Sequence, residues 1–195
     1  MPFLDRLLSF LSLTHAAHRV ERVARIPGET RRANMVEHSW QVAMAAWYVM
    51  DTQHLALDRE RVLAYALCHD IVEAYAGDTY IYDEACRETK EERERAARER
   101  IAADHPEFSS LIETMAAYER RDDEESRFVY ALDKMMDPLN IYMEDGLLWK
   151  EHGVTLAMAT EYKEARVRTH GGVFELLYRP LWERLAARER ELFPH

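Results

Sequence analysis

Hydrophobic residues recur along most of the chain at the three- and four-residue spacing of amphipathic α-helices. This spacing predicts helices over residues 2–24, 35–52, 62–76, 88–104, 106–121, 154–169 and 172–192, the last kinked at Pro180, and a further helix beginning after Asp122 or Asp123. No segment of useful length alternates polar and apolar residues as a strand does, and no segment repeats. A chain of 195 residues can bury one substantial core. The sequence therefore predicts an all-α fold in a single domain, residues 1–195.

The segment between the first two predicted helices, residues 25–34, contains Pro27 and Gly28 and is predicted to be a loop. The helix over residues 35–52 carries two apolar stripes, one of His38, Val42, Ala45 and Val49 and the other of Trp40, Met44 and Trp47. A helix that is apolar on two sides is expected to lie inside the core. This helix would then bring a histidine into the core near its first turn.

The most informative stretch is Val62 to Asp78, in which three polar residues, His69, Asp70 and Glu73, interrupt a run that is apolar almost all round. An ionised carboxylate in such a setting costs several kcal/mol unless it is paired or binds a metal. Two carboxylates one helical turn apart beside an imidazole therefore indicate a bound cation. Gly77 is expected to end the helix and to leave Asp78 in a loop at the mouth of the same site.

Asp133 is a second carboxylate in apolar company, because Leu132 and Met135 lie beside it. Together with the histidines and Asp70 it completes a set of two imidazoles and two carboxylates from three helices: His38, His69, Asp70 and Asp133. Such a set suits one divalent ion of Mn, Co, Fe, Ni or Zn, is less suited to Mg, and suits Ca poorly. His38 alone could be a hydrogen-bonded core histidine, and Glu73 alone could pair with an arginine. The whole set, with no inward lysine expected in the same helices, favours metal binding.

Charge and composition narrow the classes of partner. The formal net charge is −10 and no long basic patch occurs, which argues against nucleic acid but not against small phosphorylated ligands. Cys68 and Cys86 form neither a disulfide framework nor a CxxC motif, which favours a reducing compartment. The apolar residues of 1–13 are interrupted by charges and are too few to span a membrane. We therefore expect a cytoplasmic protein that binds neither nucleic acid nor membrane.

Four separated motifs in a fixed order resemble one family. The first is EHS at 37–39 and the second is HD at 69–70. The third is Glu73 with Gly77-Asp78, and the fourth is ALDK at 131–134. This order resembles the HD-domain metal-dependent phosphohydrolases, and within them the small 5'-deoxynucleotidase group that includes the eukaryotic HD-domain-containing protein 2. The resemblance places the domain core at about residues 22–145, with the helices of 154–192 packed on it.

The resemblance implies a role for each residue of the site. His38, His69, Asp70 and Asp133 would be the metal ligands. Glu73 would act as acid or base near the leaving oxygen, and Asp78 would position water or contact the sugar. An arginine upstream of the first histidine would hold the substrate phosphate; Arg22 is the nearest match and Arg25 the alternative. Asp137, one turn beyond Asp133 and just before Pro138, is expected to be exposed at a helix end, whereas Tyr80 and Tyr82 could line a nucleobase pocket.

The expected function is hydrolysis of a (deoxy)nucleoside 5'-monophosphate, a small-molecule nucleotide, to nucleoside and phosphate. Two positions differ from the resembling proteins. Val23 follows Arg22, where those proteins often have an aromatic residue, and Gly77-Asp78 is followed by Thr79-Tyr80, without the proline that those proteins commonly have soon after Gly-Asp. The choice between ribose and deoxyribose, and between monophosphate and triphosphate, therefore stays open. The alternatives are a dNTP triphosphohydrolase or stepwise nucleotide phosphohydrolase, and a non-catalytic helical module. A homodimer is expected because the resembling proteins associate and the helix of 172–192 has apolar residues to spare.

Overall fold

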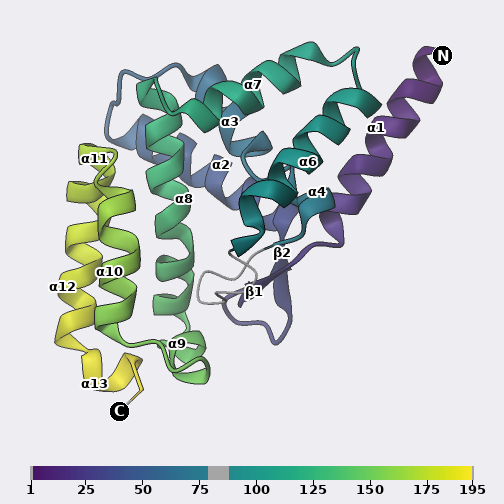
Figure 1. Cartoon of the computed structure of the whole chain (residues 1–195). Coiled ribbons are helices and arrows are strands. Elements are labelled where there is room, and N and C mark those ends of the chain that lie inside the picture. The colour runs from purple at the N-terminus through teal and green to yellow at the C-terminus, as the bar shows by residue number, and fades with distance from the viewer. Residues whose placement is uncertain (1, 79–87, 195) are drawn as a thin grey trace.

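The computed structural model describes residues 2–78 and 88–194, which form a bundle of helices with one small β-hairpin (Figure 1). The elements in chain order are α1 (Phe3–His18), β1 (Glu21–Arg25), β2 (Arg32–Asn34), α2 (Met35–Thr52), α3 (Arg59–Cys68), α4 (Glu73–Ala76), α6 (Lys90–Asp104), α7 (Ser109–Arg120), α8 (Glu124–Met143), α9 (Leu147–Glu151), α10 (Leu156–Val167), α11 (Gly171–Val173), the π-helical segment η1 (Phe174–Tyr178), α12 (Arg179–Ala187) and α13 (Glu189–Leu192). The predicted all-α class is confirmed.

Helix α8 lies at the centre of the bundle, with α2 and α3 packed on one side and α10 on the other (Figure 1). The segment η1 also contacts α8. Its apolar side chains Phe128, Leu132 and Met135 are fully buried in the main core. A second apolar cluster forms where α1, α6 and α7 meet, around Leu13 and Ile101. Because α8 contacts both α2 and α3, polar residues on these three helices can face one another inside the protein.

The N-terminal segment differs from the prediction. Helix α1 ends at His18, and β1 pairs antiparallel with β2, so that residues 21–34 form a hairpin in place of a helix end and a loop. Gly28 takes the turn with φ +84°, a value that few other residues adopt. In β1, Ala24 is buried, and the guanidinium of Arg22 reaches Asp70 in the turn after α3 and Asp137 of α8. The hairpin therefore directs Arg22 toward the helices.

The predicted central helix is also interrupted. Helix α3 ends at Cys68, the residues His69–Val72 form a turn, and the short α4 follows. Tight backbone bonds hold the turn, from Ile71 N–H to the Cys68 carbonyl oxygen (3.1 Å) and from Glu73 N–H to the Asp70 carbonyl oxygen (2.8 Å). Gly77, with φ +76°, ends α4 as the sequence predicted.

Helix α8 begins after its N-cap Asp123, whose side chain accepts a hydrogen bond from Ser126 N–H (2.7 Å). It continues through Pro138 to Met143, so Asp137 lies inside the helix and not at its end. The predicted helix 172–192 is divided into α11, η1, α12 and α13, and the π-helical segment precedes Pro180, whose ring nitrogen cannot donate a hydrogen bond. Among the described residues, no helix is both long and apolar enough to cross a membrane.

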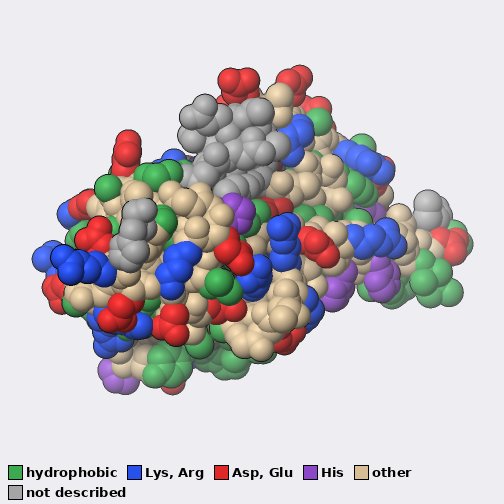
Figure 2. All heavy atoms as spheres, turned by 90° about the horizontal axis from the view of Figure 1, so that it is seen from below, with side chains coloured by type: hydrophobic (Ala, Val, Ile, Leu, Met, Phe, Trp, Pro, Cys, Tyr) green, Lys and Arg blue, Asp and Glu red, His purple; other side chains and the backbone are tan. Residues whose placement is uncertain are grey.

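The surface corrects two expectations about apolar residues. The second stripe of α2 faces solvent, with 63% of Trp40 and 43% of Trp47 exposed, so only one side of this helix is in the core. Most large apolar residues of the C-terminal helices, in contrast, are buried within the chain, as Leu181, Leu185 and Leu192 show, and Leu176 is the exception at 40% exposed. Charged side chains of both signs are mixed over the face in Figure 2, without a broad area of one sign.

Candidate metal centre

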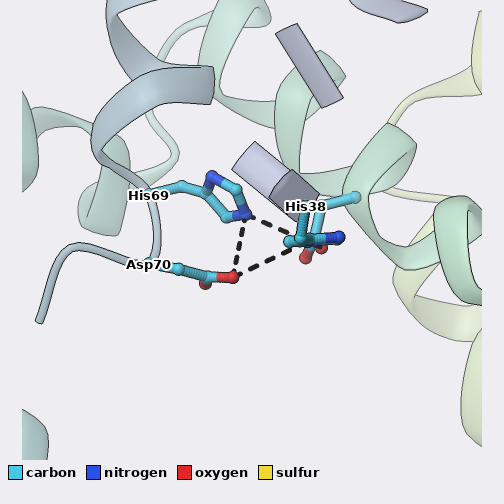
Figure 3. A group of neighbouring side chains, drawn as sticks. His38, His69 and Asp70 are labelled. Atoms are coloured by element: carbon cyan, nitrogen blue, oxygen red, sulfur yellow. Dashed lines mark hydrogen bonds and ion pairs between the residues drawn. The ribbon is translucent and has the colours of Figure 1, made fainter. Parts of the chain in front are cut away.

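Four polar side chains converge where α2, α8 and the turn after α3 meet. His38 comes from the first turns of α2, His69 and Asp70 from the turn, and Asp133 from the middle of α8. Each contributes one possible ligand atom, and these four atoms all lie within 4.8 Å of one another. Figure 3 shows the rings of His38 and His69 and the carboxylate of Asp70 turned toward a common point. The structure thus brings together all four residues that the sequence singled out as metal ligands.

The nitrogen–oxygen distances between the two imidazoles and the two carboxylates are short enough for all four groups to contact one ion. The shorter contacts join His38 Nε2 to Asp133 Oδ1 (2.9 Å) and His69 Nε2 to Asp70 Oδ2 (3.1 Å). The longer ones join His38 Nε2 to Asp70 Oδ2 (3.6 Å) and His69 Nε2 to Asp133 Oδ1 (3.7 Å). All four side chains are at least mostly buried. Two nitrogen and two oxygen atoms therefore face inward on a shared point.

The hydrogen bonding of His69 supports a ligand role. Its Nδ1 lies 2.8 Å from the carbonyl oxygen of Ala66, and an N–H there leaves the lone pair of Nε2 directed into the cluster. That Nε2 atom is buried and has no hydrogen-bond partner among the described residues. A buried polar atom without a partner is costly, and coordination of a metal ion would remove this cost. The donor set fits a transition metal ion.

The charges of the cluster favour a cation at its centre. Burial disfavours the charged form of His69, but the carboxylates of Asp70 and Asp133 outweigh burial and raise its pKa to about 10. A metal ion bound at Nε2 would replace the second ring proton. Burial and then the positive charge of Arg22 lower the pKa of His38. Despite burial, nearby positive charges hold the pKa values of Asp70 and Asp133 below their usual range. Two ionised carboxylates thus share a buried site, which is the setting that a metal ion stabilises.

Lys134 is a residue whose role the sequence prediction missed. Its Nζ lies 2.5 Å from Asp133 Oδ2, on the opposite oxygen from the one that faces His38. The lysine was not expected to point inward, but the contact fixes the carboxylate so that Oδ1 stays directed at the cluster. Its position directly after Asp133 was the only signal in the sequence, and adjacency alone does not show that two side chains touch.

Arg22 and Arg25 lie in different environments. Arg22 is 12% exposed, and its guanidinium lies 3.2 Å from Asp70 Oδ2 and 3.5 Å from Asp137 Oδ2. Arg25 instead pairs with Glu151 near the surface (2.9 Å). The expectation that Asp137 is exposed at a helix end is wrong, because this residue lies mid-helix and holds Arg22. Burial opposes its charge, but Arg22 keeps the pKa of Asp137 below its usual range.

Glu73 and Asp78 lie beside the cluster as acids with raised pKa values. Glu73 is 5% exposed, and its Oε2 has no hydrogen-bond partner in the part of the chain that the structure describes. Burial, then the negative charges of Asp70 and Asp78, raise the pKa of Glu73 well above its usual value. Burial is also the main cause of the raised pKa of Asp78. Tyr80 and Tyr82, suggested as nucleobase contacts, lie outside the described residues.

Comparison with known proteins identifies the family. The family model described as HD domain matches residues 17–171, which is most of the chain. The chain belongs to the HD-domain family. The resemblance to the HD-domain metal-dependent phosphohydrolases, expected from the EHS, HD and ALDK motifs, is confirmed.

Two relatives and one solved structure show the degree of sequence and structural similarity. The human 5'-deoxynucleotidase HDDC2 is 31% identical over 131 residues, which span 66% of this chain and 63% of the human protein. The zebrafish (Danio rerio) protein of the same name is 25% identical over 135 residues. The crystal structure of a predicted metal-dependent phosphohydrolase from Magnetospirillum magnetotacticum aligns with a TM-score of 0.81 at 32% identity, covering 99% of each chain. This chain thus spans less than two thirds of the length of the curated relatives.

Two pockets flank the HD-domain cluster. The larger, about 810 Å³, is lined by His69, Asp70 and Asp133 and by the basic residues Arg121, Lys134 and Arg166, among others. The smaller, about 480 Å³, begins at Arg22, His38 and Asp137 and is mostly apolar beyond them. The HD-domain site is therefore accessible from two sides that differ in chemical character.

Proposed function

We propose that this HD-domain protein is a metal-dependent phosphomonoesterase, a 5'-nucleotidase that hydrolyses (deoxy)nucleoside 5'-monophosphates to nucleoside and phosphate. The observation that carries the proposal is the buried cluster of two imidazoles and two carboxylates, with an arginine and a buried carboxyl group of raised pKa beside it. The names of the human and Magnetospirillum proteins support the same chemistry.

His38, His69, Asp70 and Asp133 would hold one divalent ion, for which Mn, Co, Fe, Ni or Zn suits the donor set better than Mg. When bound, such an ion polarises a phosphoryl group and lowers the pKa of water. Within the protein, Lys134 keeps the Asp133 carboxylate oriented, and the Ala66 carbonyl keeps the His69 ring oriented.

Arg22 is proposed to bind the substrate phosphate. Its guanidinium is held by Asp70 on one side and by Asp137 on the other, which orients its remaining N–H groups before substrate arrives. A planar guanidinium presents several N–H donors in fixed directions, so it matches phosphate oxygens well. Positive charge that is already in place also stabilises the charge of the phosphoryl group as the bond breaks.

Glu73 is proposed as the general acid and Asp78 as the residue that positions the attacking water, with Asp70 as the alternative. Burial and the negative charges of Asp70 and Asp78 raise the pKa of Glu73, which favours the protonated carboxyl, the form that can give a proton to the departing 5'-oxygen. Asp78, which follows Gly77 at the end of α4, lies within electrostatic reach of Asp70 and Arg22. Attack opposite the 5'-oxygen would place water and acid on different sides of the phosphorus.

A second candidate is hydrolysis of a nucleoside triphosphate, in one step or stepwise. The larger pocket supports it, because Arg121, Lys134 and Arg166 line it beside the cluster and could bind further phosphates. Lys134 is already paired with Asp133, however, which makes it less available for a substrate anion. A non-catalytic module is disfavoured, because such a protein has no need to keep four converging ligand atoms buried.

The decisive experiment measures phosphate, pyrophosphate and triphosphate released from a panel of nucleoside mono-, di- and triphosphates with Mn, Co or Mg. Hydrolysis of monophosphates to nucleoside and phosphate is the expected result. Release of triphosphate from dNTPs would favour the second candidate instead. Purified protein that binds no metal and cleaves no nucleotide would refute both.

We also propose three properties of the whole protein. Residues 1–195 form a single HD domain, in which the core of about 22–145 carries the site and the helices of 154–192 pack on it. The protein is cytoplasmic, because the thiol of the buried Cys68 is free, as is usual in a reducing compartment. The protein forms a homodimer, but through apolar residues exposed on α1 and α2, such as Leu8 and Tyr48, because most large apolar residues of the C-terminal helices are buried.

A further inference from the structure

The larger pocket beside the cluster has basic residues on the side formed by α7, α8 and α10. Its volume is about 810 Å³, and it is lined by Arg121 at the C-terminal end of α7, Lys134 of α8 and Arg166 of α10. Exposure increases from Asp133 of the cluster, which is buried, through Lys134 and Arg166, which are partly buried, to Arg121, which is exposed. Positive side chains therefore extend from the proposed metal centre toward solvent.

Two tyrosine rings hold these cations in place. The centre of the Tyr130 ring on α8 lies 4.3 Å from the guanidinium carbon of Arg121 and 5.2 Å from Lys134 Nζ. On α10 the centre of the Tyr162 ring lies 3.8 Å from the guanidinium carbon of Arg166, which also donates a hydrogen bond to the carbonyl oxygen of Tyr162. Helices α8 and α10 pack side by side (Figure 1). Each helix thus carries a tyrosine with a cation one turn later, and both pairs line one pocket.

Arg121 and Arg166 form no salt bridge with a carboxylate of the described residues. This is so although acidic residues outnumber basic ones in the chain, 36 to 26. A guanidinium has five N–H donors, and stacking on a ring leaves most of them available. The acids that line the pocket outside the cluster belong to other helices, Glu91, Glu92 and Glu94 to α6 and Glu119 to α7. A small anion is therefore best accommodated against α8 and α10.

The two products of the proposed reaction differ in charge. The nucleoside is neutral, whereas inorganic phosphate is an anion near neutral pH. Beyond Arg22, His38 and Asp137 the smaller pocket is mostly apolar, so an anion that left through it would lose hydration without gaining hydrogen bonds. The larger pocket offers guanidinium groups, which form charge-assisted hydrogen bonds with phosphate oxygens.

We infer that the larger pocket contains a second phosphate site, formed by Arg121 and Arg166, through which the phosphate product leaves the metal centre. This inference rests on the proposed function, because hydrolysis is what produces phosphate at the cluster. The site is separate from the substrate phosphate site at Arg22, which lies in the other pocket. Inorganic phosphate can therefore bind here while a nucleotide occupies the cluster.

The kinetic test measures inhibition of nucleoside monophosphate hydrolysis by inorganic phosphate at fixed ionic strength. In the native protein, part of the inhibition should persist at saturating nucleotide. Replacing both arginines, Arg121→Gln with Arg166→Gln, should raise the inhibition constant of that part about tenfold and leave KM for the monophosphate nearly unchanged. Arg184→Gln removes the same charge from an exposed position of α12 outside the pocket, and this control should behave as the native protein does.

Two kinetic outcomes would overturn the inference. The first is inhibition that saturating nucleotide removes completely in the native protein. The second is inhibition at saturating nucleotide that is equally strong in the native protein and the double variant. If, in that second case, the double variant also has a raised KM for nucleoside triphosphates, the arginines bind further phosphates of a substrate and not the free product.

A binding test separates this inference from the proposed catalysis. Isothermal titration calorimetry of the native protein with inorganic phosphate should show two binding events, one at Arg22 and one at the second site. The double variant of Arg121 and Arg166 should retain only one event, and Arg184→Gln should retain both. If the native protein cleaves no phosphate ester but this pattern is found, the proposed function fails and the second phosphate site stands. A single event in the native protein, or two events in the double variant, would overturn the second site whatever the activity.

Discussion

Replacement of Glu73 by glutamine separates catalysis from metal binding. Glutamine has nearly the same volume as glutamate, so it should fit the buried position without leaving a cavity. It replaces the ionisable carboxyl group with an amide that does not give up a proton near neutral pH. Because Glu73 is not among the four side chains that converge on one point, its replacement should leave the metal ligands in place.

The expected loss follows from what a general acid contributes. Proton transfer by a positioned side chain accelerates a reaction by about 10² to 10⁴-fold, which corresponds to about 3 to 5.5 kcal/mol of activation free energy. Glu73→Gln should lower kcat by that factor. Asp70→Ala, in contrast, removes one of the four proposed ligands and should abolish activity together with metal retention.

The pH dependence gives an independent check. Burial and the negative charges of Asp70 and Asp78 raise the pKa of Glu73, so the carboxyl is the active, protonated species below that pKa. Activity should therefore fall as the pH rises through the raised pKa. A glutamine cannot titrate, and the alkaline decline attributable to this group should disappear from the residual activity of Glu73→Gln.

The assay combines phosphate release from a nucleoside monophosphate with elemental analysis of the native protein, Glu73→Gln and Asp70→Ala. Native protein and Glu73→Gln should contain the same amount of metal per chain, and Asp70→Ala little. Equal metal loss in both variants would refute the assigned roles. An alkaline decline of unchanged position in Glu73→Gln would show that another group is the acid.

Three further predictions concern the phosphate site, the metal and the core. Arg22→Lys should raise KM for a nucleotide about tenfold, because an ammonium lacks the guanidinium fork, and a larger effect of Arg25→Lys in the same assay would contradict the assignment. Removal of metal by a chelator should lower the Tm by about 5 to 10 °C, since a ligand at 100 times its Kd adds about 2.7 kcal/mol, and Mn or Co should restore it in scanning calorimetry; an unchanged Tm would argue against a buried metal ion. Phe128→Ala should lower the free energy of unfolding by about 3 to 5 kcal/mol in urea titrations, because this side chain is fully buried, and a loss below 1 kcal/mol would contradict its place in the core.

The sequence by itself determined the helical class, most helix positions and the set of polar residues that share the buried cluster. These depend on local spacing and on the cost of burying charge, which are both readable along a chain. The inward-facing Asp70, Glu73 and Asp133 could be found in this way, because an apolar neighbourhood makes a polar residue conspicuous, whereas Asp137 was missed.

Only the tertiary structure decided which groups stand beside that cluster and which helix faces are covered. The turn at His69–Val72 and the hairpin that presents Arg22 are set by contacts between segments far apart in the sequence. Likewise, the pairing of Lys134 with Asp133 and of Gln41 with Asn140 depends on side-chain orientation, which spacing does not encode. The exposure of Trp40 has the same origin: periodicity shows that a helix has an apolar face, but the neighbouring elements determine whether that face is buried.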